Sequence, residues 1–173
     1  CELVIPNREV QDVYRFEILD KMRGRFSVSR LETMFDDLLS GNGKAFSELL
    51  GGYLRDLVSV YDTANKESFY HGFVLGMTAL FVSDYIIESN RESGYGRFDL
   101  AIIPKDVSKA GVIMEFKVAS READMAAKAK EALQQIEERE YVTEFRQRGI
   151  QRVWKYGIAF CGKKILAFQG PMC

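Results

Sequence analysis

Two short segments that read as buried strands carry charged side chains, and this feature constrains the fold more than any other. The segments lie in GRFDLAIIPKDVSKAGVIMEFKV, residues 96–118, with Asp99 in the first and Glu115 and Lys117 in the second. Burying an ion is costly unless the ion is paired or bound to a metal. The fold must therefore supply a partner for each of these three charges.

The alternation of side chains along a strand places two of these charges together. In GVIMEFKV, Glu115 and Lys117 point to the same face as Ile113, while the even-numbered residues point to the opposite face. Asp99 belongs to the neighbouring strand, whose register the sequence leaves open. Two converging carboxylates suit Mg²⁺, and a lysine beside them can activate water or stabilise a transition state. The alternative is a salt-bridged strand pair at the end of a sheet.

Length and composition indicate an ordinary globular protein of one domain. The chain has 173 residues, of which 47% are hydrophobic and 28% charged. The longest apolar run, residues 72–82, is shorter than the roughly 20 residues of a membrane span. The three cysteines have no metal-ligand spacing and are odd in number, which argues against a disulfide framework or a zinc site. We therefore expect a cytoplasmic protein with no membrane partner. The sequence does not specify its oligomeric state.

Hydrophobic periodicity predicts helices first and a sheet afterwards. The predicted helices before the sheet span residues 8–22, 29–40 and 44–60 and a segment from about residue 66, with Ser29 as an N-cap and Glu32 as its capping-box partner. The predicted strands and the helix between them follow as 84–89, 97–103, 111–118, a long helix over 121–146, and two strands around a turn at Gly162 and Lys163. Strands separated by a long helix imply a crossover, and hence a mixed α/β sheet.

The distribution of charge along the chain is uneven. The net charge is −1, but residues 146–173 contain six Lys and Arg residues and no acid, so this basic segment carries +6 and the remainder −7. A basic flank suits a polyanionic partner. The alternative interpretation is a solvated charged surface on a terminal hairpin.

An Asp on one strand followed by Glu-x-Lys on the next resembles the core of the PD-(D/E)XK nuclease superfamily. Asp99 supplies the first carboxylate and residues 115–117 the E-x-K, while Phe98 replaces the proline that often precedes the Asp. The resemblance implies an α/β fold of the restriction-endonuclease-like type, with a mixed central sheet flanked by helices and an N-terminal helical lead-in. We expect the lead-in over residues 1–61 and the nuclease-like domain over 62–173.

Longer motifs resemble one branch of this superfamily. ESFYHGFVLGM, SNRESGYGRFDLAIIP, IMEFKV, ALQQIEEREY and YGIAFCGKK, between residues 67 and 164, are similar to the nuclease domain found C-terminal to an AAA-ATPase-like domain in bacterial proteins. The opening LVIPNREV resembles the junction after the ATPase part, and the first residue is Cys1. We therefore expect an upstream ATPase-like domain in a longer polypeptide.

The resemblance also implies a role for individual residues. The implied metal ligands are three carboxylates and a backbone carbonyl: Asp99, Glu115, Glu67 and the carbonyl of Phe116. Lys117 would be the catalytic lysine, and Gln135 the polar residue that the following helix directs at the site. Tyr141 follows Gln135 by six residues and not four, so the Q-x-x-x-Y form of some relatives is absent and we expect no catalytic role for Tyr141.

The function implied is divalent-metal-dependent hydrolysis of nucleic acid, with Mg²⁺ or Mn²⁺ as cofactor and DNA favoured as substrate. The arginines expected to bind the nucleic acid are two beside the site and three in the basic segment: Arg91, Arg97, Arg146, Arg148 and Arg152. The alternative role of Arg91 or Arg97 is that of a structural partner of Glu92. His71 either orients Glu67 or has its hydrogen bonds satisfied within its own helix.

The rival function is a catalytically silent module that keeps the nuclease fold to bind nucleic acid or a partner for a fused ATPase. Completeness of the motif separates the two, because degenerate modules commonly lose a residue. Glu67, Asp99, Glu115 and Lys117 are all present, which favours the enzyme.

Overall fold

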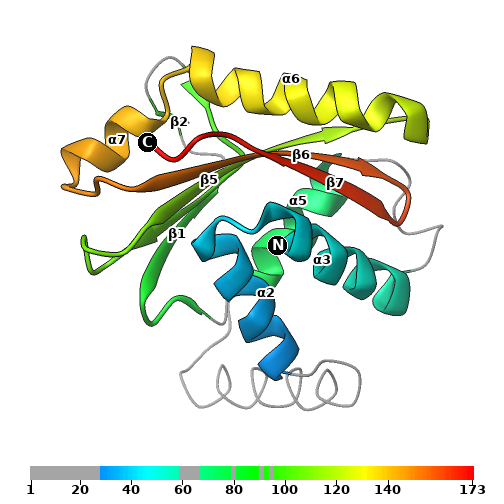
Figure 1. The fold of residues 1–173 in the computed structure, drawn as a ribbon, viewed down its shortest axis with the longest axis horizontal. Coiled ribbons are helices and arrows are strands. Elements are labelled where there is room, and N and C mark those ends of the chain that lie inside the picture. The colour runs from blue at the N-terminus through cyan, green and yellow to red at the C-terminus, as the bar shows by residue number, and fades with distance from the viewer. Residues whose placement is uncertain (1–27, 59–66, 79–80, 90–91, 94–95) are drawn as a thin grey trace, which may run out of the picture. The chain divides into compact units, whose positions relative to one another are not determined.

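The structure is a computed structural model that describes residues 28–58, 67–78, 81–89, 92–93 and 96–173 (Figure 1). The chain divides into two compact units, Cys1–Thr33 and Met34–Cys173, and the second contains every strand described here. The helix predicted over residues 8–22 lies outside the described residues. Within those residues, none of the helices combines the length and the apolar character needed to cross a membrane.

Within the described residues, three helices precede the main sheet. They are α2 (Val28–Ser40), α3 (Gly43–Leu57) and α5 (Glu67–Thr78). Because α2 begins at Val28, the prediction of Ser29 as its N-cap is wrong: Ser29 lies in the first turn, where its carbonyl accepts a hydrogen bond from the Thr33 hydroxyl at 2.9 Å. Helix α3 follows Asn42, whose side chain accepts a hydrogen bond from the Ala45 N–H. It ends at Leu57, earlier than predicted, because Val58 has an extended backbone.

A five-stranded mixed sheet forms the centre of the second unit. Its strands, in spatial order, are β1 (Tyr85–Ser89), β4 (Leu100–Pro104), β5 (Gly111–Val118), β6 (Val153–Cys161) and β7 (Lys164–Gln169). All neighbours are antiparallel except β5 and β6, which are parallel because helices connect them. This confirms the predicted mixed sheet flanked by helices.

The first strand of the charged hairpin is interrupted at the point where Asp99 lies. The prediction of one strand over residues 97–103 is wrong, since the structure has β3 (Gly96–Arg97), which pairs only with β2 (Glu92–Ser93), and then β4. The ladder between β4 and β5 stops at Leu100 opposite Met114. Asp99, the residue just before Leu100, lies in a bend. The direction of its side chain is therefore not set by the alternation of side chains along a strand.

The helix predicted over residues 121–146 is also divided. The structure has a 3-10 turn η2 (Glu122–Asp124), α6 (Met125–Glu138) and α7 (Val142–Gln147), with Glu140 at a positive φ of 52° between the two α-helices. In one continuous helix, Ile136 and Tyr141 would point to different faces. The turn between the helices brings both into a single buried cluster, in which the Phe98 ring meets the Tyr141 ring edge to face at 5.8 Å.

Helices cover both faces of the sheet. In Figure 1, α6 crosses one face while α3 and α5 lie against the other. The sheet also bonds to the end of α2, where the Tyr156 hydroxyl donates to the Leu38 carbonyl at 2.7 Å and the Trp154 indole donates to the Leu39 carbonyl at 2.9 Å. The second compact unit, Met34–Cys173, includes α3 as well as the sheet. The expected boundary between residues 61 and 62 falls among residues that are not described, so it stays a prediction.

A glycine on β6 determines how closely α6 approaches the sheet. Gly157 lies beside Glu115 in the parallel ladder. A Cβ atom at this position would lie 2.2 Å from the Ala129 carbonyl oxygen and 2.4 Å from the Leu133 nitrogen, both in the backbone of α6. The helix therefore rests directly on β6 at this glycine, which keeps the next turn of α6 within reach of Glu115.

Gly157→Ala is expected to lower the free energy of unfolding by at least about 1–3 kcal/mol, since the added methyl group would overlap backbone atoms that cannot rotate away. Gly76→Ala, in α5, serves as the control: its Cβ would meet nothing within 4 Å, so better helix propensity should stabilise by up to about 1 kcal/mol. Denaturant unfolding of both variants measures the difference. Equal stability of the two variants would contradict the close contact.

Candidate active site

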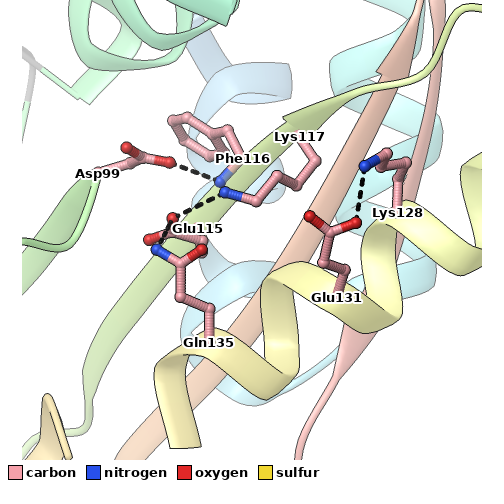
Figure 2. Close-up of polar contacts among 7 residues, drawn as sticks. All are labelled: Asp99, Glu115, Phe116, Lys117, Lys128, Glu131 and Gln135. Atoms are coloured by element: carbon pink, nitrogen blue, oxygen red, sulfur yellow. Dashed lines mark hydrogen bonds and ion pairs between the residues drawn. The ribbon is translucent and has the colours of Figure 1, made fainter. Parts of the chain in front are cut away.

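Glu115 is a buried carboxylate with two hydrogen-bond donors on one oxygen. Its exposed fraction is 2%, and Lys117 Nζ donates to Oε1 at 3.2 Å. Gln135 Nε2, from α6, donates to the same oxygen, as Figure 2 shows. The other oxygen, Oε2, is buried and accepts no hydrogen bond from the described residues. One oxygen is thus held by the protein, and one remains available to a further group.

Asp99 reaches β5 through its side chain. Its Oδ2 accepts a hydrogen bond from the Phe116 N–H at 2.7 Å (Figure 2). Its own carbonyl oxygen lies 3.0 Å from His71 Nε2, and Ser89 Oγ lies 2.8 Å from the same nitrogen. A proton on Nε2 satisfies the Asp99 carbonyl. His71 therefore attaches α5 to the backbone that carries Asp99.

The site concentrates negative charge. Burial and the Asp99 carboxylate raise the pKa of Glu115 to about 7, against the opposing effect of Lys117. Burial also raises the pKa of Asp99 and of Glu67. For Lys117, burial acts to lower the pKa, but the neighbouring carboxylates outweigh it and raise that pKa. Three carboxyl groups thus act on one ammonium group.

The donors of the site suit a hard divalent cation in their chemistry. Mg²⁺ is usually held by one or two carboxylates together with water and phosphate oxygens, and the buried Oε2 of Glu115 lacks a protein partner within the described ranges. Among those same residues, however, no three His, Cys, Asp or Glu side chains gather into a metal-binding group. Glu67, at the first residue of α5, therefore does not complete a three-carboxylate cluster in this structure.

Gln135 links the buried carboxylate to a tyrosine. Tyr141 is 1% exposed, and burial raises the pKa of its hydroxyl while a hydrogen bond to the Gln135 side chain lowers it. The sequence spacing predicted no catalytic role for Tyr141, and this stays a prediction. The turn at Glu140, which ends α6, brings Tyr141 to Gln135 despite the six-residue spacing, and no local pattern in the sequence signals that turn.

The arginines expected to bind nucleic acid differ in their surroundings. Arg146 is exposed, whereas Arg148 pairs with Glu88 at 2.9 Å and with Glu144. The exposed Arg152 donates to the Ser108 carbonyl. Arg91 lies outside the described residues, and only the backbone of Arg97 is described, in β3.

Acids elsewhere in the chain compensate part of the basic segment. Besides Arg148, the buried Lys155 pairs with Glu137, and Lys164 pairs with Glu122. At least three of the six cations counted in the sequence therefore have carboxylate partners, so the free positive charge is smaller than the count of residues suggests.

Glu115→Gln is expected to change how stability depends on pH. Folding raises the pKa of Glu115 from 4.5 to about 7, so its stabilising proton is fully bound below pH 4.5 and is lost as the pH rises through about 7. As the pH rises between those values, the free energy of unfolding of the metal-free native protein should fall by up to about 3 kcal/mol more than that of the variant, at about 1.4 kcal/mol per pKa unit. Chemical unfolding across this range measures the difference.

The control is Glu138→Gln, which changes an exposed acid on α6 and should preserve the native pH dependence. An identical dependence in the native protein and in Glu115→Gln would show that Glu115 titrates as an ordinary carboxyl group.

Comparison with known proteins identifies the family of this chain. A family model described as the PD-(D/E)XK nuclease superfamily matches residues 65–169, a span that contains α5, the five-stranded sheet and α6. No curated protein matches the chain. The residues that meet around Glu115 lie within the matched span, and so does the mixed sheet that carries them. The chain belongs to the PD-(D/E)XK nuclease superfamily, with a restriction-endonuclease-like α/β fold.

Proposed function

We propose that this protein is a divalent-metal-dependent nuclease that hydrolyses the phosphodiester bonds of nucleic acid, with DNA as the substrate and Mg²⁺ or Mn²⁺ as the cofactor. Membership of a nuclease superfamily supports the class of reaction. The observation that carries the proposal is Glu115: a buried carboxylate with one oxygen held by Lys117 and Gln135 and the other without a protein partner in the described part of the chain.

Asp99, Glu115 and the carbonyl of Phe116 are the proposed metal ligands, with Glu67 as an added carboxylate from α5. When bound, a divalent cation would lower the pKa of a water molecule and neutralise the negative charge that develops on the phosphoryl oxygens. In this proposal Gln135 keeps Oε1 of Glu115 occupied and so leaves Oε2 for the cation. The hydrogen bond from the Phe116 N–H fixes one oxygen of Asp99 in the same way.

Lys117 is proposed to act on the reacting atoms. Its ammonium group is 3.2 Å from Glu115 Oε1 and its side chain is 18% exposed, so Lys117 borders both the buried carboxylate and solvent. The surrounding carboxylates keep this amine protonated by raising its pKa. As an ammonium group it can donate to the attacking water or to a phosphoryl oxygen and stabilise the transition state electrostatically.

The second candidate function is a silent module that binds nucleic acid or a partner without cleaving. The absence of a ready cluster of three metal-binding side chains in the described ranges favours it. The complete set of Asp99, Glu115 and Lys117 favours the enzyme. A substrate phosphate can itself complete the coordination of Mg²⁺, so a site without three converged side chains is compatible with catalysis.

We further propose that the chain belongs to the branch that follows an AAA-ATPase-like domain, and that it acts in the cytoplasm. Support comes from the resemblance of its motifs between residues 67 and 164, and from cysteines without metal-ligand spacing. The sequence of the complete coding region tests the first proposal.

Cleavage of DNA is expected to require Mg²⁺ or Mn²⁺, to stop in chelator, and to fall by at least about 100-fold in Lys117→Met, Asp99→Asn and Glu115→Gln. The variants remove the cationic donor or a metal ligand, while Glu138→Gln on the exposed side of α6 should retain activity. Gel assays with DNA and RNA substrates measure cleavage, and circular dichroism verifies folding. Binding by the native protein without cleavage in any metal would support the silent module.

Arg146→Ala and Arg152→Ala are each expected to reduce the slope of log affinity against log salt by about 0.9, because each exposed cation would release one counterion equivalent. Arg148→Ala should chiefly lower the melting temperature, since it leaves Glu88 and Glu144 without this partner. Salt titrations of DNA binding and thermal melts separate these effects. An unchanged slope in the Arg146/Arg152 double variant would exclude the basic segment from the interface.

A further inference from the structure

Lys128 lies beside the candidate site without a role in the chemistry proposed above. Lys128, Glu131 and Gln135 follow one another on α6 at spacings of three and four residues, so they share one face of the helix. Figure 2 shows all three side chains extending from α6 on the side where β5 passes with Glu115 and Lys117. Gln135, which donates to Glu115, is therefore one end of a row of polar side chains on α6, and the cation Lys128 is the other end.

The row contains an ion pair that a ligand can open. Lys128 Nζ lies 2.7 Å from Glu131 Oε2, and the two side chains are 40% and 53% exposed. Exposed pairs of this kind contribute little to stability, because water competes for both charges. The Lys128 ammonium group can therefore exchange the Glu131 carboxylate for another anion at a small cost in free energy. The Lys117–Glu115 pair differs, because Glu115 is buried.

The charge balance of the site calls for a further cation. The charges of Glu115, Glu67 and Asp99 all raise the pKa of Lys117, and the Lys117 ammonium group is already paired with Glu115. A phosphate backbone that approaches these carboxylates is repelled unless positive charge lies along its path.

We propose that Lys128 binds a phosphate of the nucleic-acid backbone that flanks the cleaved one, and that Glu131 holds Lys128 until the substrate replaces it. This inference rests on the proposed nuclease function. The contact is to the backbone and carries no base specificity. The incoming phosphate repels the Glu131 carboxylate and takes its place on the ammonium group.

The chain provides a matched control on the same helix. Lys130 is exposed on α6 but lies two residues from Lys128, so its side chain leaves the helix on a different face. Lys128→Met and Lys130→Met change the net charge equally. Any effect confined to Lys128→Met therefore reflects its place beside the site and not the overall charge of the protein.

The experiment is a salt series of DNA binding by the whole chain in Ca²⁺, with the native protein, Lys128→Met, Lys130→Met and Glu131→Gln, and with thermal melts to verify folding. Lys128→Met should bind about fivefold more weakly, as for one exposed ionic contact, with a salt slope reduced by about 0.9. Lys130→Met should bind as the native protein does. Glu131→Gln should bind more tightly, because it removes the competing carboxylate.

Equal affinity and equal salt slope of Lys128→Met and Lys130→Met would overturn the proposal while leaving the nuclease function in place. Binding by Glu131→Gln that is no tighter than native would overturn the exchange between Glu131 and phosphate. A native protein that neither binds nor cleaves nucleic acid would overturn the nuclease function and this inference together.

Discussion

The hydrogen-bonded burial of the Glu115 carboxylate is the constraint on which the rest of the structure depends. A carboxylate that is 2% exposed must be compensated, and its donors come from two elements: Lys117 from the same strand and Gln135 from α6. The second donor reaches it only because α6 rests on Gly157 of the adjacent strand. Packing of the helix and satisfaction of the carboxylate are thus one requirement.

The same arrangement leaves electrostatic strain in the folded protein. Asp99 and Glu115 raise the free energy of each other's charged form, and burial adds to the effect. A fold selected for stability alone would replace such a pair with apolar residues, whereas a site that binds a cation gains from it. Local conflict of this kind is expected at functional sites, and it agrees with membership of a nuclease superfamily.

Charge counted along the sequence and charge arranged in space lead to different interpretations of the basic segment. The count of six cations without an acid is correct for residues 146–173, but Arg148, Lys155 and Lys164 have carboxylate partners from other segments. A count of charged residues along the sequence includes only those within the segment itself. Folding adds acids from α6, α7, β1 and the 3-10 turn that precedes α6, which leaves Arg146 and Arg152 as the better candidates for a polyanion.

The sequence alone determined the mixed sheet, the superfamily, and the shared face of Glu115 and Lys117, because these follow from local periodicity and a compact motif. Three features required the tertiary structure. Asp99 meets β5 through its side chain because the ladder stops before it. Tyr141 reaches Gln135 because α6 ends in a turn at Glu140, and Gln135 reaches Glu115 because α6 packs closely on the sheet. Periodicity describes neighbours within one element, whereas contacts between elements depend on where strands end and how closely helices pack.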